Sequence, residues 1–229
     1  MAPVLGYWDV RGLGQYLRYL LEYAQVEYKE KRYSFGTDPN WTRDEWLADK
    51  QNLDLDFPNL PYYLDGDVKL TQSLAILKYL GRKHGLAPKT NELQRRVDMI
   101  EMQAFDLIMS AGDLCYDPAY SDEKRKHFLA DVTEKLRQFE ALLEKDGPFA
   151  AGQNVTYVDF LLYEALEIVR VLGPSNFKRN FQSLEQYNER VADLPGLREY
   201  LASPRFKDWP FFGPFANAMG PQHKPPSDY

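Results

Sequence analysis

The segment from Asp56 to Ser73 constrains the fold more than any other part of the chain, because it joins a proline-bounded turn, a hairpin and the start of a helix. Pro61 opens an apolar run, and a cis-proline there would turn the backbone amide and carbonyl of Leu60 toward an extended ligand instead of a neighbouring strand. Asp65-Gly66 then predicts a tight hairpin turn.

The helix that closes this segment offers a place for a carboxylate. Gln72 and Ser73 stand directly before the apolar run at 74–80, so a serine hydroxyl and free backbone amides would meet at a helix N-terminus. Such a helix end binds negative groups. A small-molecule site and a structural hairpin with an ordinary serine cap are equally compatible with these residues alone.

The first 86 residues combine strand and helix patterns. The predicted elements are a strand at 4–8, a glycine-bearing loop at 9–14, an apolar-striped helix at 17–24, a strand at 28–33, a loop at 34–41, a short polar helix at 43–49, the hairpin, and a helix at 73–82. This order, βαβ, then α, then ββα, is typical of a thioredoxin-like domain with a mixed sheet, although the pattern ranks that fold only among several α/β options.

Everything after a helix-breaking stretch at 85–90 is predicted to be helical. The expected helices are 91–116, 121–145, one that opens at a capping box between Thr156 and Asp159 and runs to about 171, and shorter ones near 183–192 and 194–203. The predicted fold class is therefore α/β plus all-α. The predicted parts are a thioredoxin-like domain at 1–86, an all-α domain at 91–215 and a flexible tail at 216–229.

Charge and cysteine content exclude several functions. The formal net charge of −6 argues against partners such as nucleic acid or an anionic membrane surface. No apolar run is long enough to span a bilayer, and no signal-peptide pattern is present. The single Cys115 cannot form an intramolecular disulfide. A cytoplasmic protein is therefore expected. The scattered histidines lack zinc spacing, so no metal site is predicted.

Several motifs, taken together, resemble the cytosolic glutathione transferases, most closely the mu class, and they cover nearly the whole chain in the right order. They are the start Pro3-Val4-Leu5-Gly6-Tyr7-Trp8-Asp9-Val10-Arg11-Gly12, the set Arg43, Trp46 and Lys50, the run Phe57-Pro58-Asn59-Leu60-Pro61-Tyr62-Tyr63, then Leu70-Thr71-Gln72-Ser73, and the cap Asn154-Val155-Thr156-Tyr157-Val158-Asp159-Phe160. The resemblance implies a homodimer that binds glutathione as a co-substrate and needs no further cofactor.

The resemblance also implies how the sulfur is activated. A free thiol with a pKa of about 8.5 is only a few per cent ionised at neutral pH, and lowering this pKa by about two units takes roughly 2.7 kcal/mol of selective thiolate stabilisation. Tyr7 matches the family tyrosine that donates a hydrogen bond to the glutathione thiolate. Without the surrounding motifs, a core tyrosine on a buried strand would be the commoner interpretation.

The remaining implied contacts divide between glutathione and an electrophile. The glutathione-binding set is Tyr7, Trp8, Leu13, Arg43, Trp46, Lys50, Asn59, Leu60, Pro61, Gln72, Ser73 and, from the partner subunit of the dimer, Asp106. Phe57 resembles an aromatic anchor that inserts into the partner subunit. The electrophile pocket is expected between Val10 and Leu13 on one domain and one face of the long helix, formed by Phe105, Met109, Gly112 and Tyr116. Tyr116 is expected to act as a hydrogen-bond donor. Residues spaced in this way along a helix more often belong to the core.

Two functions from different classes remain in competition. The first is an enzyme that conjugates the glutathione thiolate to small hydrophobic electrophiles. The second is a ligand-binding or structural protein on the same scaffold. Tyr7 and Tyr116 favour the enzyme, because a purely structural protein would have no need of them. A disulfide exchanger is disfavoured, because the first strand ends in tyrosine and the chain has no Cys-x-x-Cys. One departure from the family pattern is Tyr16, which stands where a proline is usual.

Overall fold

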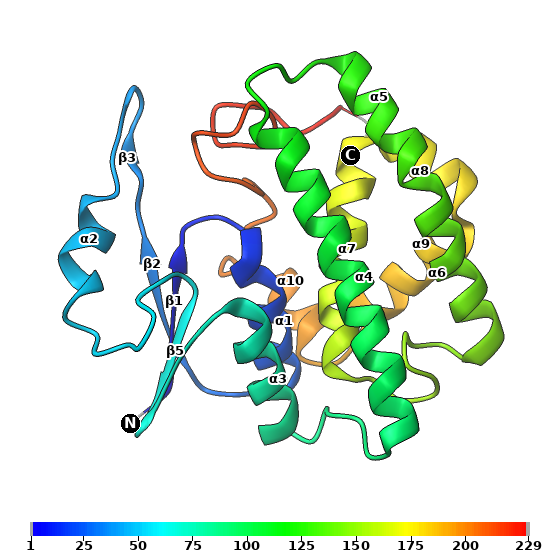
Figure 1. The fold of residues 1–229 in the computed structure, drawn as a ribbon, viewed down its shortest axis with the longest axis horizontal. Coiled ribbons are helices and arrows are strands. Elements are labelled where there is room, and N and C mark those ends of the chain that lie inside the picture. Colours follow the sequence, from blue (N-terminus) through cyan, green and yellow to red (C-terminus); the bar gives the residue numbers. More distant parts are fainter. Residues whose placement is uncertain (1, 228–229) are drawn as a thin grey trace.

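The computed structural model of the protein describes residues 2–227 and has an N-terminal sheet domain beside a larger helical domain (Figure 1). The elements of the first domain are β1 (Val4–Trp8), η1 (Gly12–Gly14), α1 (Gln15–Tyr23), β2 (Lys29–Tyr33), β3 (Gly36–Thr37), β4 (Asn40–Trp41), α2 (Asp44–Lys50), β5 (Tyr62–Asp65), β6 (Val68–Thr71) and α3 (Ser73–Lys83). The predicted α/β domain followed by an all-α domain is confirmed.

The main sheet has the order β2-β1-β5-β6. β1 pairs in parallel with β2 across α1 and antiparallel with β5, which gives the mixed sheet that the βαβ and ββα pattern predicts. α1 covers the sheet with a face of Leu17, Leu20 and Leu21, which are fully buried. The Leu60–Pro61 bond is cis, as expected, and Gly66 has a φ of +60° in the hairpin turn.

A second, two-stranded sheet was not predicted. β3 and β4 pair in the stretch that the sequence indicated as a loop. These strands are too short for an alternation of apolar and polar residues to be visible, and they protrude from the domain above α2 (Figure 1).

The helical domain contains α4 (Asn91–Tyr116), α5 (Asp122–Asp131), α6 (Thr133–Asp146), α7 (Tyr157–Leu172), α8 (Pro174–Asn180), α9 (Gln182–Ala192) and α10 (Leu197–Leu201). The prediction of one helix over 121–145 is wrong, because the helix breaks at Val132. Thr133 explains the break: its Oγ1 donates to the Leu129 carbonyl at 2.8 Å, and this local bond competes with the helical ladder. The short α8 was missed.

α7 is the central helix of the domain and packs on α1, α3 and α4. It starts at the predicted capping box, where Thr156 N donates to Asp159 Oδ2 at 2.8 Å. None of the helices within residues 2–227 is long and apolar enough to cross a membrane.

The first residues of the segment from 216, expected to be a flexible tail, pack against the rest of the protein. Asn217 N donates to the Cys115 carbonyl at 2.6 Å, Phe211 N donates to Met219 O at 3.1 Å, and Met219 is buried. Apolar burial of this kind stabilises the position of a segment that has no regular secondary structure. The segment therefore lies beside the end of α4, between the two domains (Figure 1), while residues 228–229 of the predicted tail lie outside the described residues.

Candidate active site

Tyr7 lies near the end of β1, with its side chain wrapped by the loop that leads to α1. A Cβ on Gly12 would stand 2.6 Å from Tyr7 Oη, and a Cβ on Gly14 would stand 2.5 Å from the ring. Gly12 also has a φ of +40°, which favours glycine. The two glycines therefore allow the backbone to close around the tyrosine, which a side chain at either position would prevent.

The Tyr7 hydroxyl is held as a hydrogen-bond donor. Leu13 N donates to Tyr7 Oη at 2.9 Å, which uses a lone pair of the oxygen and leaves its proton free. Burial raises the pKa of Tyr7 to about 12, against the opposing effects of the Leu13 bond and of the Arg18 charge. At neutral pH the group is therefore a protonated phenol, able to donate to an anion within hydrogen-bonding distance of the hydroxyl.

Tyr7 and Tyr116 line one cavity of about 270 Å³. Tyr116 is the last residue of α4, and its Oη accepts a hydrogen bond from Gly213 N at 3.0 Å. Burial raises the pKa of Tyr116 as well, so both hydroxyls are protonated at neutral pH. The structure thus brings a phenol from each domain to the same space, as the sequence predicted.

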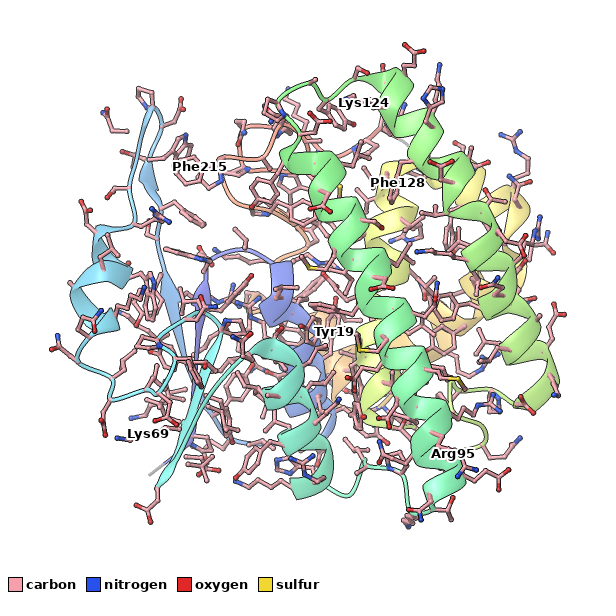
Figure 2. The ribbon with its side chains drawn as sticks, viewed as in Figure 1. Tyr19, Lys69, Arg95, Lys124, Phe128 and Phe215 are labelled. Carbon is pink, nitrogen blue, oxygen red and sulfur yellow. The ribbon has the colours of Figure 1, made fainter. Side chains whose placement is uncertain are left out.

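Aromatic residues that the sequence analysis missed form much of the remaining wall. The lining comprises Tyr7, Trp8, Val10, Gly12, Phe35, Arg43, Tyr116, Phe211, Phe212, Gly213 and Phe215. Phe35 stacks on Trp8 with ring centroids 4.1 Å apart and meets Phe215 edge-on at 6.2 Å. Figure 2 shows Phe215 on the side of the helical domain that faces the β3–β4 hairpin.

The predicted pocket face of α4 contributes less than expected. Phe105, Met109 and Gly112 are not part of the lining, and neither is Leu13. The C-terminal segment is the reason, because it occupies the space beside α4: the Phe212 ring is the nearest group to Gly112, 3.9 Å from where a Cβ would be. Phe105 packs against the large apolar core instead.

The residues expected to hold the middle and head of glutathione meet at one end of the sheet. Gly6 pairs with Tyr62, and Tyr62 pairs with Thr71, so Leu60-Pro61 and Gln72-Ser73 lie beyond the same end of the sheet as Tyr7, with Leu60-Pro61 beside it and Gln72-Ser73 one strand further away. Asn59 Oδ1 accepts from Leu60 N at 2.9 Å. Gln72 has a φ of +68°, a strained value that turns the chain into α3, and strain of this kind is found at ligand sites.

α2 carries the three residues expected at the glycyl end of glutathione. Arg43 precedes its first turn and lines the cavity, while Lys50 is its last residue and is partly exposed. Trp46 is buried, edge-on to Tyr33 with ring centroids 5.4 Å apart. Trp46 therefore also holds α2 on the sheet. A packing role alone would explain its burial and its contact with Tyr33.

Two residues predicted to act between subunits lie on the surface. Asp106 is exposed on α4, and none of the ion pairs among residues 2–227 involves it. The Phe57 side chain is 73% exposed, which is unusual for a large apolar residue.

A buried ion pair, also missed from the sequence, ties the site loop to the helical domain. Arg11 donates to Glu164 of α7 through Nη2 at 2.6 Å and through Nε at 3.1 Å. The Arg11 guanidinium lies 3.8 Å from the centroid of the Phe211 ring, and Gly12 N donates to Phe211 O at 2.9 Å. Arg11 therefore fixes the C-terminal wall of the cavity relative to Tyr7.

Known proteins share this fold and much of this sequence. Residues 3–82 match the family model of the glutathione S-transferase N-terminal domain, and residues 105–204 match that of the glutathione S-transferase C-terminal domain. Glutathione S-transferase Mu 2 of Rattus norvegicus is 42% identical over 94% of this chain and 98% of its own. The glutathione S-transferase of Tyrophagus putrescentiae is 44% identical over 95% and 97%. The crystal structure of the glutathione S-transferase Blo t 8 aligns with a TM-score of 0.86 at 38% identity, covering 93% of this chain and 98% of that one.

The chain therefore belongs to the glutathione S-transferase family. The mu-class resemblance seen in the motifs is confirmed, since Glutathione S-transferase Mu 1 of Homo sapiens is also 42% identical, over 94% of this chain and 98% of its own.

Proposed function

We propose that this protein conjugates the thiolate of glutathione to small hydrophobic electrophiles. The observation that carries the proposal is Tyr7: a buried phenol, protonated at neutral pH, whose oxygen accepts from Leu13 N while its proton remains available. A hydrogen bond from the Tyr7 hydroxyl to a thiolate is charge-assisted, so it stabilises the thiolate more than it stabilises the neutral thiol. The difference lowers the pKa of the thiol, so the nucleophile is present at neutral pH.

The sheet end next to Tyr7 suits the peptide. An extended tripeptide beside Leu60-Pro61 would place its γ-glutamyl carboxylate at the start of α3, where Ser73 and free backbone amides can bind it. Arg43 and Lys50 would neutralise the glycyl carboxylate. Glutathione is then a co-substrate, and the proposed chemistry needs no further cofactor.

The cavity wall indicates the second substrate. Its aromatic rings, Trp8, Phe35 and Phe215 among them, favour flat apolar molecules, and about 270 Å³ holds a single small ring system. Tyr116 can donate a hydrogen bond to an oxygen that becomes negative as the sulfur adds, which stabilises the transition state. The Gly213 N–H bond to Tyr116 Oη leaves the Tyr116 proton available for this.

We also propose a cytoplasmic homodimer with shared sites. An apolar hollow of about 210 Å³ lies between α4 and α6 and is lined by Arg96, Met99, Ile100, Gln103, Gln138, Phe139 and Leu142. Met99 is 69% exposed in one subunit, and Phe57 of a second copy is the exposed aromatic group that could fill the hollow. Asp106 on the same helix could then reach the glutathione ammonium in the partner's site.

A conjugation assay with glutathione and a generic aryl halide tests the function. Wild-type protein should turn over, Tyr7→Phe should be about ten- to a hundredfold slower at saturating substrates, and Tyr23→Phe, which removes a hydroxyl outside the cavity, should match the wild type. A protein that binds glutathione but gives no turnover above the uncatalysed rate would instead be a binding protein on this scaffold. Equal rates for Tyr7→Phe and wild type would remove Tyr7 from the mechanism.

A further inference from the structure

Phe35 connects the two sides of the cavity. It lies between β2 and the β3–β4 hairpin, is half-buried, and lines the cavity together with residues of the C-terminal segment at 211–215. Its ring stacks on Trp8 of β1, with ring centroids 4.1 Å apart and 19° between the ring planes. It also meets the ring of Phe215 edge-on, with centroids 6.2 Å apart. Phe35 therefore bridges the sheet domain and the C-terminal segment.

Gly213 allows the Phe35 ring to lie close to the C-terminal segment. A Cβ on Gly213 would stand 3.0 Å from Phe35 Cζ and 3.4 Å from Tyr116 Oη. Carbon atoms of neighbouring groups pack at about 3.5–4.0 Å, so a side chain at this position would press on the ring. Gly213 N also donates to Tyr116 Oη at 3.0 Å. The edge of Phe35 and the hydroxyl proposed to assist the reaction therefore lie against the same glycine.

The cavity is small for a ligand site. Its volume is about 270 Å³, whereas pockets for small molecules generally measure about 300–1,000 Å³. A cavity of about 150 Å³ binds one benzene ring, so two linked rings need about twice that volume before the sulfur of glutathione is counted. The cavity can therefore hold an electrophile with one aromatic ring and is too small for one with two.

Phe35 also takes up the best stacking surface in the cavity. A flat electrophile gains from lying against the face of an aromatic ring, and Trp8 offers the largest such face. Because the Phe35 and Trp8 centroids are 4.1 Å apart, no further ring fits between them. The Phe35 ring thus occupies a position that a second ring of a substrate could take.

We propose that Phe35 is a specificity-determining residue that limits the second substrate to electrophiles with a single aromatic ring. It does so by covering the face of Trp8 and by closing the cavity against Gly213. The inference rests on the proposed function, since it concerns the electrophile of that reaction. With an aryl halide, the glutathione thiol releases its proton to solvent, the sulfur bonds to a ring carbon, and the halide leaves. A second ring on the same molecule needs the space that Phe35 fills.

A packing role alone predicts a different outcome. If Phe35 only holds the β3–β4 hairpin against the C-terminal segment, its loss should loosen the cavity and slow the reaction with every electrophile alike. The two accounts therefore differ in the ratio of the rates with large and small electrophiles, because a general loss of activity leaves that ratio unchanged.

The test compares kcat/KM at saturating glutathione for two activated aryl halides, one with a single ring and one extended by a phenyl group. Each value is divided by the uncatalysed rate of that compound with glutathione. Wild-type protein should favour the compound with one ring. In Phe35→Ala the ratio of the two-ring to the one-ring compound should rise about ten- to a hundredfold, as expected for an apolar group that gains a pocket. Phe35→Leu, which refills most of the space, should bring the ratio back toward the wild-type value.

Trp41→Ala is the matched control. Trp41 pairs with Gly36 in the β3–β4 hairpin but is not part of the cavity lining, so its loss perturbs the hairpin and should leave the ratio at the wild-type value. Thermal unfolding shows whether each variant is folded, and Phe35→Val, a smaller truncation, replaces Phe35→Ala should that variant unfold.

Three results would overturn the proposal: a wild-type ratio in the truncated Phe35 variant, an equal rise in Trp41→Ala, or a wild type that already turns over the two-ring compound as well as the one-ring compound. If wild-type protein gives no turnover with the one-ring compound, the proposed function falls and this inference with it. A wild type that is active, beside a Phe35 variant with an unchanged ratio, overturns the inference alone.

Discussion

Replacing Asp159 by alanine should destabilise the helical domain far more than the loss of a helix cap. The carboxylate is 0% exposed and accepts from Thr156 N at 2.8 Å, from Ala150 N at 2.8 Å and from Tyr187 Oη at 3.0 Å. A lost cap costs about 0.5–2 kcal/mol. Here the variant also leaves buried N–H groups without an acceptor, at about 1–3 kcal/mol each.

These costs are partly offset, because burial raises the pKa of Asp159 and so disfavours the ionised form that the variant removes. We expect a net loss of about 3–5 kcal/mol, from the lost cap and the two unpaired buried N–H groups after this offset. For a chain of this size the loss lowers the melting temperature by roughly 6–20 °C.

Differential scanning calorimetry and urea unfolding measure the effect, with Ser121→Ala as the matched control. Ser121 Oγ accepts from Lys124 N at 3.2 Å at the exposed start of α5, so that variant loses an ordinary cap only. If Asp159→Ala loses no more stability than Ser121→Ala, the network around Asp159 does not anchor α7, and the reasoning is wrong.

Further predictions concern the dimer, the site and its pH dependence. Phe57→Ser should be a monomer by light scattering, and a stable, fully active Phe57→Ser monomer would contradict the shared site. Asp106→Ala should raise the KM for glutathione with little change in kcat. Gly14→Ala should lower kcat about ten- to a hundredfold, because its Cβ would stand 2.5 Å from the Tyr7 ring; wild-type turnover would show that the ring can move. Because the pKa of Tyr7 is raised from 10.0 to about 12, the free energy of unfolding should fall as the pH rises through this interval. Turnover at pH 9 should not decline through ionisation of Tyr7, and a Tyr7-dependent decline there would refute a protonated Tyr7 as the donor.

The sheet domain was predictable because its local signals agree with its long-range packing. The apolar strand at β1, the Pro61 turn and the glycine at the hairpin each specify one local structure, and the sheet register places them together. Tyr7 at the strand end and Tyr116 at the helix end followed from this order and from the family resemblance.

The C-terminal wall of the cavity was not predictable by the same means. Phe211, Phe212 and Phe215 lie in an irregular segment, where no period relates side-chain direction to sequence position. Arg11 was also missed, since its partner Glu164 is 153 positions away and a charged residue is ordinarily exposed. The break at Val132 depends on one side-chain bond that competes with the helix, and a helical pattern continues on both sides of it.

The pKa of the glutathione thiol bound to wild type and to Tyr7→Phe tests the central claim most directly, measured by thiolate ultraviolet absorbance against pH. The phenol proton of Tyr7 is the proposed source of thiolate stabilisation, and Phe keeps the ring that packs on Gly12 and Gly14. The account predicts a thiol pKa below about 8.5 in wild type and a rise of about one to two units in Tyr7→Phe, equivalent to roughly 1.5–3 kcal/mol, with glutathione affinity little changed. An equally depressed thiol pKa in both proteins would contradict it and would move the activation of sulfur to another donor.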